Sequence, residues 1–190
     1  MLLFRGKIPS GWLPKVLSDL PAVLVDHAHL ERKAATSALN LQKYHDLHSR
    51  VEELNSIAIE ELQHFDQVLA LLRRRAIPFT QARPSPWIKG LMRAVRLGRR
   101  GQVIDHLICA ALIEGRSCEK FQILARALDP TNPELAAFYD GLVESEGNHY
   151  ATYLLMAKAI NKAETEMRLD FFLDLDAVLI REPNPHPMLH

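Results

Sequence analysis

Two Glu-x-x-His sequences lie in separate helical stretches, Glu61 with His64 and Glu146 with His149. Residues three apart share one face of an α-helix, so each pair can direct a carboxylate and an imidazole at the same point. Each pair is preceded by another glutamate at a similar distance, 30 residues earlier at Glu31 and 32 residues earlier at Glu114. Four carboxylates with two imidazoles and no thiolate suit iron or manganese. The six residues are therefore candidate ligands of a two-metal site.

Glu60 and Glu61 are both close enough to His64 for either to be the ligand, since spacings of three and four share a helix face. The second copy separates them. There Glu146 keeps the three-residue spacing, whereas the residue four before His149 is Ser145. This internal match assigns Glu61 as the ligand, and it leaves Glu60 as a supporting or solvent-facing carboxylate.

The residues between these motifs read as helices, because apolar residues recur at spacings of three and four. Ser18 or Asp19 can cap the first long helix, and Thr131 or Asn132 the fourth. The three prolines of IPFTQARPSPW interrupt the pattern between the second and third. A short lead-in and a polar turn at 45–49 complete the connections. Helices are expected over about 21–44, 50–75, 87–97, 101–128, 133–161 and 164–180, followed by an irregular tail at about 181–190.

The candidate ligands fall at matching depths in this arrangement. Glu31 lies about 14 residues before the first turn and Glu61 about 12 residues after it, each worth roughly 20 Å of helix. The same arithmetic brings Glu114 level with Glu146. One long crossover, about 76–100, between the second and third long helices is the ferritin-like arrangement. The sequence thus predicts one all-α domain over 1–190, a ferritin-like four-helix bundle with an extra C-terminal helix.

Carboxylates on solvated helix faces are the alternative interpretation of the motifs. It is disfavoured because the four glutamates lie on apolar faces, where an ionised glutamate needs a partner or a metal. His27 and Tyr153 share those faces and are candidates to support the ligands. A structural histidine and a core tyrosine are the preferred readings of these two.

Net charge is zero, but the crossover is strongly basic: nine Lys and Arg and no acidic residue lie between positions 73 and 100. The remainder then holds 14 basic and 23 acidic residues. The steep excess of cations disfavours a merely solvated face, and the short apolar stripe of the crossover disfavours an anionic membrane, so a nucleic-acid backbone is the favoured partner. The predicted nucleic-acid contacts are Arg73, Arg74, Arg75, Lys89, Arg93, Arg96, Arg99 and Arg100.

No signal-peptide core or membrane-spanning run is apparent, because charged residues interrupt every long apolar stretch. The two cysteines, Cys109 and Cys118, are nine residues apart on one expected helix, too far for a disulfide within it. Both features favour a cytoplasmic protein.

Four stretches, DHAHLERKAATSALNL, EELQHFDQVL, LICAALIEGRSCEKFQIL and ESEGNHYATYLLMA, resemble the tRNA 2-methylthio-N-isopentenyladenosine hydroxylases. These are bacterial di-iron monooxygenases of ferritin-like fold, and the resemblance runs from about residue 9 to 182. It implies two iron ions, favoured over manganese, and hydroxylation of the isopentenyl group beside the tRNA anticodon. It also implies dioxygen and an external electron donor, which the sequence does not identify. The ending EPNPHPMLH departs from the family pattern.

Two other functions share parts of this pattern. A ferritin- or rubrerythrin-like protein that handles iron or removes peroxide has the same ligands, but it needs no cationic crossover. An RNA-binding bundle with a vestigial site would bind no metal.

Overall fold

The computed structural model describes residues 3–190, apart from the side chains of residues 99 and 100. Every regular element in this part of the chain is helical, as expected. In chain order the elements are α1 (Trp12–Ser18), α2 (Leu20–Leu41), the 3-10 helix η1 (His45–Arg50), α3 (Val51–Arg74), α4 (Pro86–Arg93), α5 (Arg99–Leu128), α6 (Pro133–Ile160) and α7 (Lys162–Leu179).

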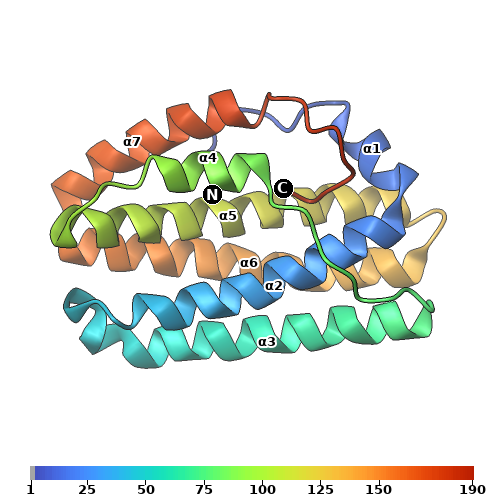
Figure 1. The fold of residues 1–190 in the computed structure, drawn as a ribbon, viewed down its shortest axis with the longest axis horizontal. Helices are drawn as coiled ribbons and strands as arrows, with labels where there is room; N and C mark the ends of the chain where they lie inside the picture. Colours follow the sequence, from blue (N-terminus) through green and yellow to red (C-terminus); the bar gives the residue numbers. More distant parts are fainter. Residues whose placement is uncertain (1–2) are drawn as a thin grey trace.

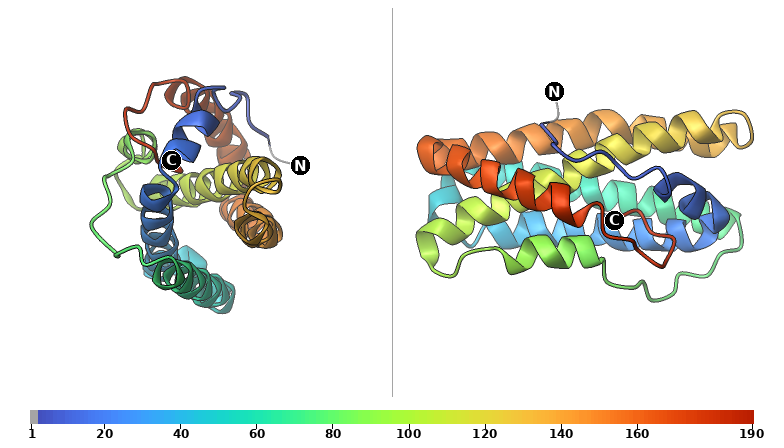
Figure 2. Two further views of the ribbon diagram at one scale, coloured as in Figure 1. Left: turned by 90° about the vertical axis from the view of Figure 1, so that its right-hand side faces the viewer. Right: turned by 90° about the horizontal axis from the view of Figure 1, so that it is seen from above.

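Four long helices pair into two hairpins, α2 with α3 and α5 with α6, and these lie side by side (Figure 1). Seen along the bundle in the left panel of Figure 2, the hairpins form four adjacent rods, while α4 and α7 lie outside α5. This is the predicted ferritin-like bundle with a long crossover and an additional C-terminal helix.

Side-chain caps fix where four of the helices begin, among them α4, which Ser85 caps through the Ile88 N–H (3.1 Å). Asp19 accepts a hydrogen bond from the Ala22 backbone N–H (3.1 Å), and Asn132 accepts one from Leu135 (3.3 Å). Asn161, which the sequence analysis did not single out, caps α7 through the Glu164 N–H (3.1 Å). Each cap satisfies a helix N–H that has no partner within its own helix.

The apolar core is divided into two clusters, and a polar band separates them. One cluster contains Leu54 of α3 and Leu107 of α5, and the other contains Val68 of α3 and Phe121 of α5. The residues between them on α3 and α5 include Glu61, which is fully buried. Helices α2 and α6 cross both clusters in the same way, so all four helices carry polar residues at one depth.

The structure corrects several details of the sequence prediction. The lead-in contains the short helix α1, and the expected turn at 45–49 is the 3-10 helix η1. The crossover helix ends at Arg93, four residues earlier than expected, and Gly98 then turns into α5 with φ of 107°, which favours glycine.

Helix α7 is held to the bundle by a buried ion pair. Arg116 of α5 pairs with Asp176 of α7, and neither side chain is exposed. Asp176 also accepts a hydrogen bond from Trp87 Nε1 at 3.0 Å, which ties α4 to the same point. One carboxylate thus joins three helices.

The tail is irregular as predicted, yet its last three residues are buried. The Leu189 N–H donates to Asp26 Oδ2 of α2 at 2.9 Å. His190 Nε2 lies 3.0 Å from Ser117 Oγ of α5, and the His190 ring stacks on Trp87. The tail therefore contacts both α2 and α5.

Replacing Asp176 by Ala should lower the free energy of unfolding by about 3–5 kcal/mol, because the buried Arg116 would lose its buried carboxylate partner and keep the partly exposed Glu119. Chemical denaturation followed by circular dichroism measures this. Asp174→Ala is the matched control, since Asp174 is exposed on the same helix and pairs only with Arg5. It should cost less than about 1 kcal/mol. Equal losses in the two variants would contradict the assignment.

Candidate metal centre

Six side chains converge in the polar band between the two apolar clusters. Their potential ligand atoms form two groups, each lying within 4.8 Å of one another. Two glutamates, Glu61 and Glu146, belong to both groups, as two bridging carboxylates would. The first group is Glu31, Glu61, His64 and Glu146, and the second is Glu61, Glu114, Glu146 and His149.

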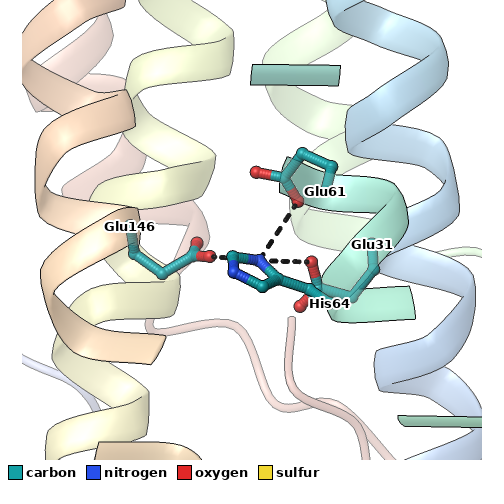
Figure 3. A group of neighbouring side chains, drawn as sticks. All are labelled: Glu31, Glu61, His64 and Glu146. Carbon is teal, nitrogen blue, oxygen red and sulfur yellow. Dashed lines mark ion pairs between the residues drawn. The ribbon is translucent and has the colours of Figure 1, made fainter. Parts of the chain in front are cut away.

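All six predicted ligands are therefore brought together, and each is at most 6% exposed. Glu31 comes from α2 and Glu114 from α5, and each Glu-x-x-His pair comes from α3 or α6. Figure 3 shows the His64 ring pointing between Glu31 and Glu146, with Glu61 beside it. The helix lengths set this register, as the matching distances to the turns predicted.

The distances around the two imidazoles leave the inward nitrogens available to ligate. His64 Nδ1 lies 3.7 Å from Glu31 Oε2, 4.0 Å from Glu61 Oε2 and 3.8 Å from Glu146 Oε1, all beyond hydrogen-bonding range. His149 Nδ1 lies 2.7 Å from Glu61 Oε1, but without hydrogen-bond geometry. The ligand atoms thus surround a common space.

Several of these buried atoms have no hydrogen-bond partner in the described part of the chain. They are both oxygens of Glu61, Glu146 Oε1, and the Nδ1 atoms of His64 and His149. A buried polar atom without a partner costs roughly 1–3 kcal/mol, and more when it is charged. Two divalent cations would supply partners for all of them, so the residues present fit a carboxylate-bridged metal pair.

The pKa values of the four buried glutamates also indicate a site for cations. Burial, followed by the charges of neighbouring glutamates, raises the pKa of Glu61 and of Glu146 well above the usual range. Burial also raises the pKa of Glu114 to about 7. For Glu31, burial is outweighed by the adjacent His27, and its pKa is lowered. The cluster resists holding four negative charges unless cations are bound.

His27 and Tyr153 both lie next to the cluster. His27 is fully buried, its Nε2 lies 2.5 Å from Glu31 Oε1, and its ring stacks on Tyr139. Tyr153 is also fully buried, and its hydroxyl has no hydrogen-bond partner among the described residues. Burial and then the charge of Glu114 raise the Tyr153 pKa far above its usual value, which keeps the phenol protonated.

Two contacts to the histidines escaped the sequence analysis. Glu60, taken as supporting or solvent-facing, accepts a hydrogen bond from His149 Nε2 at 3.0 Å while its side chain remains 46% exposed. Ser145 Oγ lies 3.5 Å from His64 Nε2. The contacts run between α3 and α6, so spacing within one helix could not reveal them.

The predicted nucleic-acid contacts do not form one uniform surface. Arg74 and Arg75 pair with Glu134 at the end of the bundle. Arg96 is bound to Asp105 and Glu164 and closes the turn into α5. Arg73, Lys89 and Arg93 are exposed, and the side chains of Arg99 and Arg100 lie outside the described residues.

A four-helix bundle whose centre holds four glutamates and two histidines defines the class of ferritin-like dimetal-carboxylate proteins. A solved structure supports this class. "Protein 43 with aldehyde deformylating oxygenase activity from Synechococcus" superposes with a TM-score of 0.89 and 26% identity, over 100% of this chain and 96% of that one. The neighbour is an oxygenase by name.

Within that class, the chain belongs to the tRNA-(MS[2]IO[6]A)-hydroxylase (MiaE) family, whose model matches residues 2–190. A Pseudomonas putida protein named tRNA 2-(methylsulfanyl)-N(6)-isopentenyladenosine(37) hydroxylase is 35% identical over 184 residues, which are 96% of this chain and 88% of that protein. A Salmonella typhimurium protein of the same name is 40% identical over 131 residues, 69% of this chain and 47% of that protein. The resemblance drawn from the sequence is confirmed, and the chain is a hydroxylase of ferritin-like fold.

Alanine substitutions should separate the shared ligands from the unshared ones. Glu146→Ala removes a carboxylate common to both groups and should abolish stable binding of both ions. Glu114→Ala should mainly empty one position, because only the second group uses Glu114. Metal content after anaerobic reconstitution and desalting measures this. Glu52→Ala, an exposed change on α3, should load like the wild type, and full loading of Glu146→Ala would rule out the assignment.

The raised pKa of Glu114 predicts a pH dependence in the metal-free protein. Because the folded pKa of about 7 exceeds the ordinary 4.5, protonated Glu114 favours folding below pH 4.5, and this contribution is lost as the pH rises through 7. Glu114→Gln mimics the protonated form. Relative to it, the metal-free wild type should lose on the order of 3 kcal/mol between pH 4.5 and 8.

Urea unfolding of both proteins at several pH values, with a chelator present, measures that difference. Glu144→Gln, which changes an exposed carboxylate of α6, should follow the wild type at every pH. A constant offset between Glu114→Gln and the wild type would show that Glu114 does not titrate in this range.

Proposed function

We propose that this chain hydroxylates the isopentenyl group of 2-methylthio-N-isopentenyladenosine in tRNA, with two iron ions held by the buried cluster. The observation that carries the proposal is the set of six buried ligands with unpaired inward atoms, in a chain of this hydroxylase family. A tRNA substrate also favours the cytoplasm as the place where the enzyme works.

The chain's residues have distinct roles in this proposal. Glu61 and Glu146 would be shared by the two metal ions, Glu31 and His64 would complete the ligands of one, and Glu114 and His149 those of the other. The iron pair supplies reductive activation of dioxygen, which no amino-acid side chain provides and which an unactivated C–H bond requires. An external donor, whose identity is open, supplies two electrons.

The two apolar clusters restrict water on either side of this centre. Leu107 and Phe121 of α5 lie in the clusters before and after Glu114, and both are at most 1% exposed. A dry surrounding protects a reactive oxidant from side reactions and strengthens the electrostatic contacts of the ligands. It also suits an isopentenyl group, which is itself apolar.

The surface formed by α3 and α6 is unsuited to RNA. Residues 51–72 and 133–157 contain no Lys or Arg. Their exposed acidic side chains would repel phosphates at close range. They are Glu52, Glu53, Asp66, Glu134, Asp140 and Glu144.

The opposite surface, made of α2, the crossover and α4, offers cations and an exposed aromatic ring. Figure 1 shows the crossover passing over α2 to reach α4 on this side. Phe79 is 42% exposed, its ring stacks on His29 with centroids 4.5 Å apart, and Arg32 lies over it. Exposed rings beside cations are surfaces on which unpaired bases stack.

We therefore place the tRNA contact on this second surface. Two of the eight contacts predicted from sequence are exposed cations of this surface, namely Lys89 and Arg93. Arg73 is also exposed, but it lies at the end of α3. Arg74, Arg75 and Arg96 serve the protein's own ion pairs instead. Arg32, Lys33 and Arg83 are exposed cations of the same surface that were not among the predicted contacts.

The activity is tested with tRNA that carries the unhydroxylated nucleoside. Iron-loaded protein, a chemical or enzymatic reductant and labelled dioxygen should add one labelled oxygen atom to the isopentenyl group, detected by mass spectrometry of the digested tRNA. Glu146→Ala should give none. Full iron loading with no labelled product, under conditions in which the reductant reduces the iron, would overturn the proposal.

Charge reversal tests the proposed RNA surface. The double variant Lys89→Glu with Arg93→Glu should weaken tRNA binding at least tenfold at low salt, and it should flatten the salt dependence because fewer counterions are released. Lys158→Glu near the end of α6 is the matched control and should bind normally. Unchanged affinity of the double variant at low salt would remove α4 from the RNA surface.

A further inference from the structure

The two candidate ligand histidines differ in what holds their outer nitrogens. The Nε2 of His149 donates to the carboxylate of Glu60 at 3.0 Å, while its Nδ1 faces the cluster. An imidazole fixed in this way carries its proton on Nε2 and presents the Nδ1 lone pair to a metal. The negative charge of Glu60 also makes that lone pair more basic.

His64 has no such support. Its Nε2 contacts Ser145 Oγ at 3.5 Å, the outer limit of a hydrogen bond. The Ser145 hydroxyl already donates to the Leu142 carbonyl at 2.9 Å, so toward His64 it can only accept. A long contact to a neutral oxygen neither orients the ring firmly nor raises its basicity appreciably.

The two supporting groups occupy equivalent positions of the internal repeat. Glu60 directly precedes Glu61 in α3, and Ser145 directly precedes Glu146 in α6. Each reaches across to the histidine of the other helix. The six ligand types are matched between the two halves, and the repeat becomes unequal at this supporting position.

The unshared glutamates also differ in their contacts. Glu31, which belongs only to the group containing His64, has Oε1 engaged by His27 at 2.5 Å. Only Oε2 then faces His64 and the centre. Glu114 belongs to the group containing His149 and lies within reach of no comparable histidine outside the cluster among the described hydrogen bonds. The two sides thus differ in the support of their imidazoles, and this difference at the histidines carries the inference.

We propose that Glu60 is a positioning residue that makes the two metal positions unequal. The position formed by Glu114 and His149 fills first and releases its ion last, whereas the position formed by Glu31 and His64 is the exchangeable one. Removing a carboxylate that supports a ligand histidine typically lowers metal affinity 10- to 100-fold. The inference rests on the proposed ligands, because it concerns their relative strength.

Stepwise anaerobic titration of the metal-free protein with Co²⁺, followed by its visible absorption and by competition with a chelator, tests the proposal. The wild type should bind in two phases that differ in affinity. Glu60→Ala should weaken the tighter phase roughly 10- to 100-fold and leave the weaker phase nearly unchanged. Glu60→Gln should fall between them, because an amide oxygen accepts the hydrogen bond without the charge.

The controls separate this inference from the function on which it rests. Glu53→Ala removes a similarly exposed carboxylate of α3, which pairs with Arg50 and not with a candidate ligand, and it should titrate as the wild type does. Two Co²⁺ binding phases of equal affinity in the wild type would overturn the proposed inequality of the two metal positions, but not the proposed function. The same holds if Glu60→Ala lowers the affinity of the weaker phase instead of the tighter one. Failure of the wild type to bind any metal would overturn the proposed function itself.

Exchanging the two supporting groups gives a gain-of-affinity test. In the double variant Glu60→Ser with Ser145→Glu, the supporting carboxylate is placed beside His64 instead of His149. The Co²⁺ affinity of the His64 position should therefore rise, and that of the His149 position should fall. Histidine resonances in the paramagnetic NMR spectrum of the Co²⁺ protein identify which ring is ligated first. If the exchanged protein folds and His149 is still ligated first, Glu60 does not set the order. If it does not fold, the single Glu60 variants decide the question.

Discussion

Four glutamate side chains are buried at one depth of a helical bundle, and this placement sets the conditions that the rest of the structure meets. Ionised carboxylates without partners are strongly disfavoured in an apolar interior. The fold nevertheless holds the four carboxylates close together, and Glu61 and Glu146 belong to both ligand groups. Apolar clusters above and below fix the helices so that the carboxylates stay together. The interior is therefore built around positive charge that the polypeptide itself only partly supplies.

The distribution of surface charge follows from the same arrangement. Helices α3 and α6 each carry a Glu-x-x-His pair, and the outward faces of these two helices are acidic. Cations are concentrated on the side of α2, the crossover and α4. A polyanion approaching the bundle therefore meets attraction on one side and repulsion on the other. The net charge of zero does not show this uneven distribution of surface charge, whereas the basic composition of the crossover predicts part of it.

The grouping of the six candidate ligands at one depth could be predicted from the sequence, because helical periodicity and equal distances to a turn are local properties. Glu61 was separated from Glu60 by the second copy of the motif alone. The contacts made by Glu60, Arg96 and Asp176 could not be predicted in the same way. They join helices that are far apart in the chain, and their geometry depends on packing between those helices. The same limit explains why a basic residue such as Arg96, which closes a turn within the protein, was assigned to RNA.

The buried end of the tail has a consequence for the order in which the molecule can be assembled. Residues 188–190 contact Asp26 of α2 and Ser117 of α5, yet they are synthesised after all four ligand-bearing helices. During translation the first hairpin emerges with half of the candidate ligands, before α5 and α6 exist to complete either group. Until α5 and α6 have been made, an ion would be held by three side chains at most. The tail's contacts with α2 and α5 can form only after all six candidate ligands are present.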